Sequence, residues 1–214
     1  MLTRLLLEPG RIVSVDGLID ALWGPGPPQG AASSLQSLIV QLGRTIGAEV
    51  LETKPPGYRV LVRPGELDLD RFRILVESAR GAALAARATK LRHALALWRG
   101  PALAEFAFET FAQPHIVRLE EFRLAALEER VEAELELGAH VDLVGELEVL
   151  VGKFPLRERL RGQYMLALGR SGRQAEARRT YDEGRRLLVD RLGIGPRREL
   201  QQLHRAILRQ DAES

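Results

Sequence analysis

The stretch that decides the fold is residues 138–196, which read GAHVDLVGELEVLVGKFPLRERLRGQYMLALGRSGRQAEARRTYDEGRRLLVDRLGIGP. Gly138 and Gly172 stand 34 residues apart. Packing residues follow each glycine at offsets of five and nine: Leu143 and Leu147 after the first, Ala177 and Tyr181 after the second. A glycine ends a helix with a left-handed cap, and the next helix then presents its apolar stripe. The stretch therefore predicts stacked antiparallel helix pairs.

The spacing and the flanking sequence extend this helical region in both directions. A period of 34 residues is that of tetratricopeptide (TPR) repeats. Towards the C-terminus, Gly193 to Pro196 precede a last predicted helix over residues 197–210. Towards the N-terminus, Pro114 suits a first helical position and begins a long helix that reaches Leu137. Apolar stripes on two roughly opposite sides of this helix indicate that it packs on both sides, as inner helices of a stacked array do.

A further helix pair is predicted ahead of the long helix. The break at Pro64-Gly65 is followed by helices over residues 69–80 and 84–98. A less regular connector over residues 100–113 carries Phe106, Phe108 and Phe111. We therefore place a domain boundary at residue 64, with an all-helical domain over residues 65–214.

The first 64 residues have a different order of elements. A short helix over residues 2–7 precedes a helix over residues 15–23, which Ser14 can cap, and a third helix runs from Ala31 to Ile46 with Gly47 as its stop. Two strands follow, over residues 50–53 and 58–63; in the second, Tyr58, Val60 and Val62 alternate with Arg59, Leu61 and Arg63, which is the period of a half-buried hairpin strand. Three helices and a β-hairpin are the order of a winged helix-turn-helix, in which the third helix enters the DNA major groove. The predicted fold class is mainly α.

Composition and charge set limits on the class of protein. The chain has 214 residues and no cysteine, so disulfides and thiolate metal sites are excluded. No apolar run approaches the roughly 18 residues of a membrane span, and no secretory leader opens the chain, so we expect a cytoplasmic protein without membrane contact. The net charge of +2 hides a patchwork: residues 114–150 carry 3 basic and 10 acidic groups, whereas residues 151–214 carry 15 and 8.

Catalysis, metal binding and cofactor binding find no support in the sequence. The four histidines are scattered over different predicted helices without ligand spacing: His93, His115, His140 and His204. No HExxH, GxSxG, GxGxxG or Walker loop occurs. We expect no enzyme activity, no metal and no cofactor.

At this point the chain resembles a known family over nearly all of its length. The runs LTRLLLEPGRIVSVDGLIDALWG, LQSLIVQLGRTIG and PPGYRV resemble the winged helix of the SARP regulators (Streptomyces antibiotic regulatory proteins). The runs LALWRGPAL, PLRERLRGQYMLAL, SGRQAEA and LVDRLGIGPRREL resemble the bacterial transcriptional activation domain (BTAD) that follows it. The family's winged helix begins with several strands, whereas Met1 falls where its first helix starts. We therefore expect a winged helix without those strands.

The resemblance implies a transcription activator of a biosynthetic gene cluster. In this family the winged helix binds direct repeats near a promoter, and the complex recruits RNA polymerase. Double-stranded DNA and the RNA polymerase holoenzyme are thus the expected partners, and side-by-side binding makes a homodimer on DNA a further candidate. An alternative of another class is a helical protein-interaction or ligand-sensing module whose DNA-binding half is vestigial.

The DNA-contacting residues follow from the predicted elements and from this family role. On the third helix, one face carries Ser34, Ser37, Gln41 and Arg44. A glutamine can pair with adenine and an arginine with guanine. On the hairpin, the candidates for phosphate contacts are Lys54, Arg59 and Arg63. Plain solvated faces are the alternative interpretation of both sets.

Two further charged groups of residues have open interpretations. The acidic series on the long helix is interpreted as solvated flanks between its packing stripes rather than as a surface for a basic partner: Glu120, Glu121, Glu128, Glu129, Glu132, Glu134 and Glu136. The arginines of the last third are expected to pair with this helix in preference to DNA: Arg157, Arg159, Arg161, Arg178, Arg179, Arg185 and Arg186.

Overall fold

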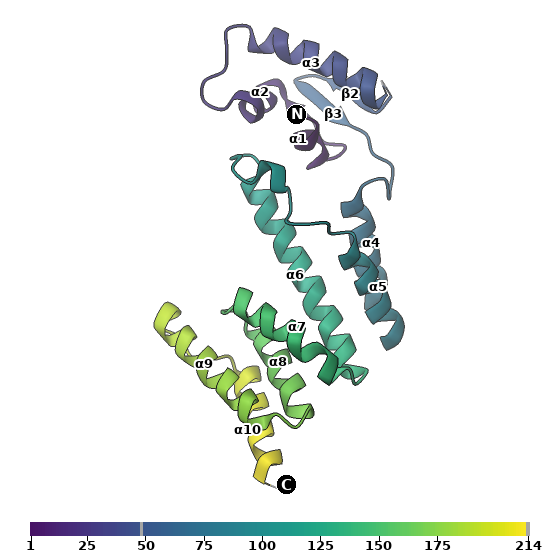
Figure 1. The fold of residues 1–214 in the computed structure, drawn as a ribbon. Coiled ribbons are helices and arrows are strands. Elements are labelled where there is room, and N and C mark those ends of the chain that lie inside the picture. The colour runs from purple at the N-terminus through teal and green to yellow at the C-terminus, as the bar shows by residue number, and fades with distance from the viewer. Residues whose placement is uncertain (48, 213–214) are drawn as a thin grey trace. The chain divides into compact units, whose positions relative to one another are not determined.

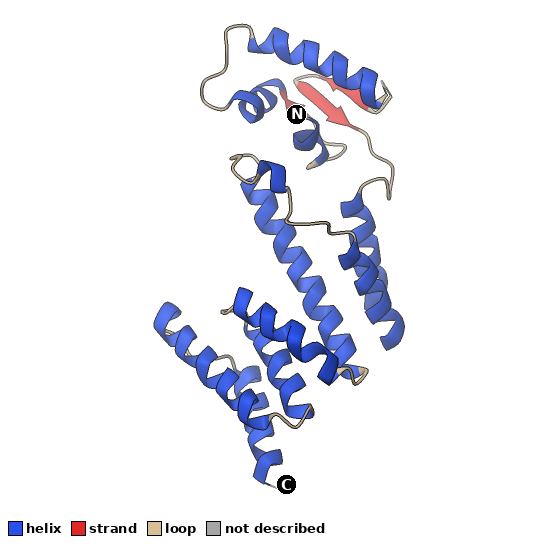
Figure 2. Cartoon of the chain, in the orientation of Figure 1, coloured by secondary structure: helices blue, strands red, loops and turns tan. Residues whose placement is uncertain are grey.

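The structure is a computed structural model that describes residues 1–47 and 49–212 (Figures 1 and 2). Its residues divide into two compact units. Unit 1 comprises Met1–Ile74 with Ala96–Arg123, and unit 2 comprises Leu75–Leu95 with the described residues from Leu124 onward. Most of the described residues are helical, so the predicted mainly α class is confirmed.

Unit 1 opens with short helices around a small antiparallel sheet. Its elements are α1 (Leu2–Leu6), β1 (Val13–Ser14), α2 (Val15–Trp23), α3 (Ala31–Ile46), β2 (Leu51–Lys54) and β3 (Gly57–Val60). The strand order is β1-β3-β2, with Val13 opposite Tyr58 and Leu51 opposite Val60. The predicted hairpin is confirmed with each strand shifted at its ends, and β1 is a third strand that the sequence pattern did not indicate.

Local signals place these helices as expected. The Ser14 hydroxyl accepts a hydrogen bond from the backbone N–H of Gly17 at 3.1 Å, which is the predicted cap of α2. Gly47, with φ of 101°, ends α3 and donates its N–H to the carbonyl of Gly43. One cluster of buried side chains joins α1, β1, α2, α3 and β3: Leu5, Val13, Leu18, Leu35, Ile39, Tyr58 and Val60. The cluster orients α3 because Leu35 and Ile39 face into it.

The rest of unit 1 is built around aromatic side chains. It contains the start of α4 (Asp68–Arg80), the 3₁₀ turn η1 (Ala104–Phe106) and the start of α6 (Gln113–Glu136). Phe72 of α4 lies between two rings in edge-to-face geometry, with centroid distances of 5.4 Å to Trp98 and 4.8 Å to Phe122. Such pairs add to the free energy gained from burial alone. The irregular connector is confirmed, and the ring centroids of Phe106 and Phe111 within it lie 5.9 Å apart.

Unit 2 is a set of packed helix pairs. It contains the end of α4, α5 (Leu84–Ala96), the rest of α6, α7 (His140–Lys153), α8 (Glu158–Arg170), α9 (Gln174–Leu192) and α10 (Arg198–Ala212). Helix α8 packs against α7, α9 and α10. Gly138 and Gly172 have φ of 92° and 75°, so both adopt the left-handed conformation predicted for helix caps. After each glycine the next N–H reaches back five residues, from Ala139 to the carbonyl of Glu134 and from Arg173 to that of Leu168.

The acidic series on α6 is not wholly solvated, and the sequence-based interpretation was wrong for two of its members. Glu128 and Glu134 are only 2% and 4% exposed. Each is held by two arginines: Glu134 by Arg92 at 2.6 Å and Arg130 at 2.9 Å, and Glu128 by Arg157 at 2.9 Å and Arg159 at 3.5 Å. Burying a carboxylate is tolerable only when it is paired and hydrogen-bonded, and these arginines meet that condition.

The basic groups of the last third divide between three roles. Arg157 and Arg159 pair with α6, as expected. Arg161 is buried instead and donates to the backbone carbonyls of Thr180 and Pro155. Four of the five arginines of α9 were expected to pair with α6, but they lie exposed, and the structure gives them no ion pair within the described part of the chain: Arg178, Arg179, Arg185 and Arg186. The predicted intramolecular pairing is therefore wrong for these four.

Candidate nucleic-acid interface

Helix α3 presents one buried and one exposed face because its apolar residues recur with helical spacing. Leu35 and Ile39 are buried in the cluster of unit 1, and Leu42 and Ile46 pack partly buried against it. The predicted packing side of α3 is thereby confirmed. Every residue opposite that side projects into solvent, which makes the outer face available to a partner.

All four residues predicted to contact DNA on α3 are exposed: Ser34, Ser37, Gln41 and Arg44. They recur at i, i+3, i+7 and i+10 and therefore share one face of the helix. The hydroxyl of Ser37 donates to the carbonyl of Ser33 at 3.2 Å, which leaves its oxygen lone pairs available as acceptors. No carboxylate among the described residues pairs with Arg44. DNA contact by these side chains stays a prediction.

Val40 belongs to the same exposed surface, and the sequence analysis missed it. Its side chain is 54% exposed, between Ser37 and Arg44 on the helix. A β-branched apolar residue on the solvent face gains nothing from burial, so its presence there is itself the signal. Apolar side chains at this position in a recognition helix can contact the methyl group of thymine.

The hairpin arranges its three basic residues unequally. Lys54 is the last residue of β2 and lies opposite Gly57, next to the turn at Pro55-Pro56. Arg59 on β3 is held by Glu52 of the neighbouring strand at 2.7 Å, so its charge is already compensated. Arg63 lies beyond the end of β3, and its nearest carboxylate is that of Glu66 at 3.8 Å. Lys54 and Arg63 are therefore better placed than Arg59 to contact a phosphate.

The helices and the three-stranded antiparallel sheet of unit 1 have the element order predicted for a winged helix. An exposed helix face with an amide, a guanidinium and hydroxyls offers donors and acceptors to base edges. The hairpin beside it in unit 1 offers cations that suit phosphate oxygens. Among the described residues, no group of three or more His, Asp or Glu side chains is arranged to hold a metal ion.

Comparison with known proteins identifies the family. The family model of the bacterial transcriptional activator domain matches residues 67–208. The regulatory protein DnrI of Streptomyces peucetius is 39% identical over 222 residues, which cover 97% of this chain and 82% of DnrI. The chain belongs to the SARP family. The resemblance that the motifs from both halves of the sequence suggested is therefore a true family relationship, and the expected family is confirmed.

Other relatives of this SARP chain are longer. The regulatory protein AfsR of Streptomyces griseus is 42% identical over 217 residues, which cover the whole of this chain but only 22% of AfsR. The solved structure of Mycobacterium tuberculosis EmbR, in complex with a low-affinity phosphopeptide, matches with a TM-score of 0.92 at 35% identity. That match covers 98% of this chain and 58% of EmbR. The fold of the SARP chain is thus that of the corresponding part of EmbR.

The relatives bear on the remaining expectations about this SARP chain. They are regulatory proteins and not enzymes, as the sequence led us to expect. Within residues 1–47 and 49–212, none of the helices combines the length and the apolar character that crossing a membrane requires.

Proposed function

We propose that this chain is a DNA-binding transcriptional activator, with residues 1–64 as its DNA-binding part and residues 65–214 as its activation domain. The observation that carries the proposal is the outer face of α3. It presents Gln41 and Arg44 beside Val40, all three exposed, on a helix fixed to the core by Leu35 and Ile39. Such a rigid helix with an exposed polar face suits direct contact with base edges in a major groove.

The proposed contacts divide into base contacts and phosphate contacts. Gln41 and Arg44 pair with base edges, and Val40 contacts a thymine methyl. Ser34 and Ser37 lie one to two turns nearer the start of α3 and bind phosphate or base atoms through their hydroxyls. Lys54 and Arg63 bind phosphates, and Arg59 orders the hairpin through Glu52 and approaches DNA as a charge-compensated group.

The partners follow from the family. We infer that the sites are direct repeats in promoters of a biosynthetic gene cluster, bound by two copies side by side, and that the bound protein recruits RNA polymerase in the cytoplasm. Four exposed arginines of α9 support a partner surface in unit 2, because in the described part of the chain no ion pair joins a carboxylate to Arg178, Arg179, Arg185 or Arg186. An acidic surface of a protein partner suits them.

The deciding experiment is fluorescence anisotropy of the 214-residue chain with labelled promoter fragments from its own genome, titrated with salt. We expect saturable binding that prefers a repeated site over a scrambled fragment of the same length and weakens steeply as salt rises. Arg44→Ala and Gln41→Ala should each lose about 1–3 kcal/mol of binding free energy and relax base preference at one position. Lys54→Ala should weaken all fragments equally and lower the salt slope by about 1.

Controls separate a DNA-binding defect from a folding defect. Arg205→Ala removes an exposed arginine from α10 and should bind like the parent chain. Circular dichroism of each variant should match that of the parent. Binding no tighter than to random DNA, by a folded protein, would refute the proposal and favour a helical interaction module. Polymerase recruitment is tested by run-off transcription, in which reversing the charge of Arg178 and Arg185 should abolish activation without reducing DNA affinity.

A further inference from the structure

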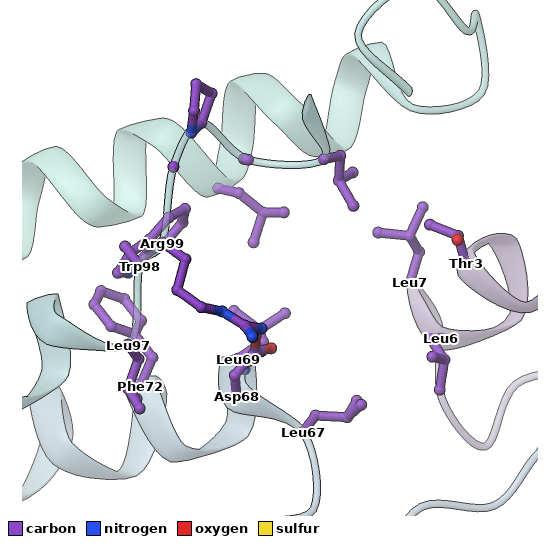
Figure 3. Close-up of a pocket in the computed structure, with 15 residues that line it drawn as sticks. Thr3, Leu6, Leu7, Leu67, Asp68, Leu69, Phe72, Leu97, Trp98 and Arg99 are labelled. Carbon is purple, nitrogen blue, oxygen red and sulfur yellow. Dashed lines mark hydrogen bonds and ion pairs between the residues drawn. The ribbon is translucent and has the colours of Figure 1, made fainter. Parts of the chain in front are cut away.

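A pocket with a volume of ≈ 370 Å³ opens within unit 1 (Figure 3), and α3 contributes no residue to its lining. Helix α1 forms one side, and the start of α4, residues 97–103 and Leu119 of α6 form the others. In Figure 3, Thr3, Leu6 and Leu7 stand opposite Phe72 and Trp98. Of its 15 lining residues, 11 have apolar side chains. The volume lies within the range of about 300–1,000 Å³ that is usual for small-molecule sites, which are also mostly apolar.

The wall formed by residues 97–103 is held in place from behind. The guanidinium of Arg123 donates to the carbonyl of Gly100 at 3.2 Å and lies 5.1 Å from the ring centroid of Trp98. The backbone N–H of Ala102 donates to the carboxylate of Glu120 at 2.6 Å. Because side chains of α6 fix this backbone, the pocket is formed before any ligand arrives. A preformed site avoids the entropic cost of ordering a loop upon binding.

The same wall contains a strained residue. Leu103 has φ of 51° and ψ of 38°, and it is the one non-glycine residue with positive φ in the described part of the chain. A residue with a Cβ atom loses roughly 1–2 kcal/mol in the left-handed region. Strain of this kind concentrates at ligand sites, where the surrounding structure imposes it. Here the residue with the strained backbone, Leu103, also places its apolar side chain in the lining of the pocket.

The charges on the rim indicate the class of ligand. Asp68 and Arg99 are the two charged residues of the lining, and they pair with each other at 3.6 Å. Figure 3 shows the side chain of Arg99 reaching towards Asp68. A pair that cancels itself favours neither an anion nor a cation, although each partner can still hydrogen-bond a neutral polar group. The half-buried ring of Trp98, which the buried Phe72 supports from below in edge-to-face contact, suits a flat apolar body.

We propose that this pocket is a binding site for a small, uncharged, predominantly apolar ring compound with one polar group at the rim formed by Asp68 and Arg99. Such a ligand contacts Leu6 of α1 and Leu7 directly after it, while Leu5 of the same helix is buried in the cluster that supports α3. A ligand in the pocket therefore contacts the helix α1, which in turn packs in the cluster that supports α3, the helix proposed to contact DNA. The binding itself does not require DNA, so it can be tested separately from the proposed function.

The experiment uses two matched fluorescent probes and the full chain. N-phenyl-1-naphthylamine is uncharged, and 1-anilinonaphthalene-8-sulfonate is the same ring system with a sulfonate. Trp98 lines the pocket, and a Trp23→Phe background makes it the sole tryptophan, so energy transfer from Trp98 reports a probe in this site. We expect saturable binding of one equivalent of the uncharged probe, with an affinity at least tenfold above that of the sulfonate.

Two variants change the pocket in opposite ways. Thr3→Phe fills it from the half-buried side of α1, and Leu103→Gly removes part of its wall while relieving the positive φ. Each should weaken binding of the uncharged probe at least tenfold. Thr89→Phe makes the same substitution at an exposed site on α5 in unit 2 and should bind like the parent. The proposal is overturned by equal affinity for the two probes, by the absence of saturable transfer from Trp98, or by unchanged binding in both pocket variants that remain folded.

Discussion

We expect glycine at position 184 to be required for stability, because the buried side chain of Arg161 occupies the space that any larger side chain at this position would need. A Cβ at this position would lie 2.2 Å from Cδ and 2.4 Å from Nε of Arg161. That is about 1.3 Å short of the roughly 3.5 Å at which nonbonded carbons meet. Arg161 is 3% exposed, and its guanidinium donates to the carbonyls of Thr180 at 2.9 Å and Pro155 at 3.0 Å. Burial lowers the pKa of Arg161 from its ordinary value, with Glu183 partly opposing this.

The structure gives the magnitude of the effect. Gly184→Ala displaces the guanidinium and breaks both hydrogen bonds, each of which contributes about 1.5–3 kcal/mol when one partner is charged. Part of this is offset, because the displaced charge regains water. We therefore expect a net loss of about 2–4 kcal/mol of unfolding free energy. Arg161→Ala alone should lose about 2–3 kcal/mol, since it leaves a cavity and two unsatisfied carbonyls.

The double variant is the informative one. Once Arg161 is alanine, a methyl group at position 184 enters space that the arginine has vacated. The pair Gly184→Ala with Arg161→Ala should then be no less stable than Arg161→Ala alone, so the coupling energy should equal the loss for Gly184→Ala, about 2–4 kcal/mol. Strict additivity of the two single losses would refute the idea that the glycine serves to admit the arginine.

The two units can be monitored separately in a urea titration. Both tryptophans, Trp23 and Trp98, lie in unit 1, so tryptophan fluorescence follows that unit. Far-ultraviolet circular dichroism follows both units. Gly184→Ala and Arg161→Ala should lower the urea concentration at the midpoint of the circular dichroism transition and leave the midpoint of the tryptophan fluorescence transition unchanged. Gly145→Ala, at an exposed position on α7 with open space around it, is the matched control and should not be destabilised.

Three other substitutions have expected outcomes in the same assays. Gly57→Ala places a methyl group 1.9 Å from the carbonyl oxygen of Val13, so it should break the pairing of β1 with β3 and cost about 3 kcal/mol or more, seen in tryptophan fluorescence. Gly43→Ala meets only ordinary contacts and should stabilise α3 by about 1 kcal/mol; destabilisation would show that this helix is strained. His204 is stacked on Tyr181, and burial lowers its pKa below the ordinary value. The unfolded chain therefore takes up the proton first, so stability should fall as pH drops below about 6.5, and His204→Phe should reduce that slope; an unchanged slope contradicts this account.

The order of helices and their ends could be predicted from the sequence because local interactions decide them. Ser14 caps α2 with its own hydroxyl, and Gly47, Gly138 and Gly172 end helices because they adopt positive φ at little cost. The face of α3 that carries Gln41 and the other candidate DNA-contacting residues likewise follows from helical spacing. These features depend on residues a few positions apart, which the sequence displays directly.

Other features depended on which distant residues came together. The sequence shows Glu128 and Glu134 as members of one acidic series, but only packing brings arginines from other helices to them and allows their burial. No local pattern indicated the burial of these two carboxylates, because it is decided by contacts across the fold.

By itself, the sequence determined the mainly α class, the helix caps, the polar face of α3 and the family of this protein. Only the tertiary structure decided the pairing of β1 with β3, the burial of Arg161 against Gly184, and the pocket whose wall includes Leu103. The physical reason is the range of the interactions. Caps and amphipathic faces arise within one or two turns of a helix, whereas buried charges, close backbone contacts and cavities arise between segments whose proximity is set by the folded chain as a whole.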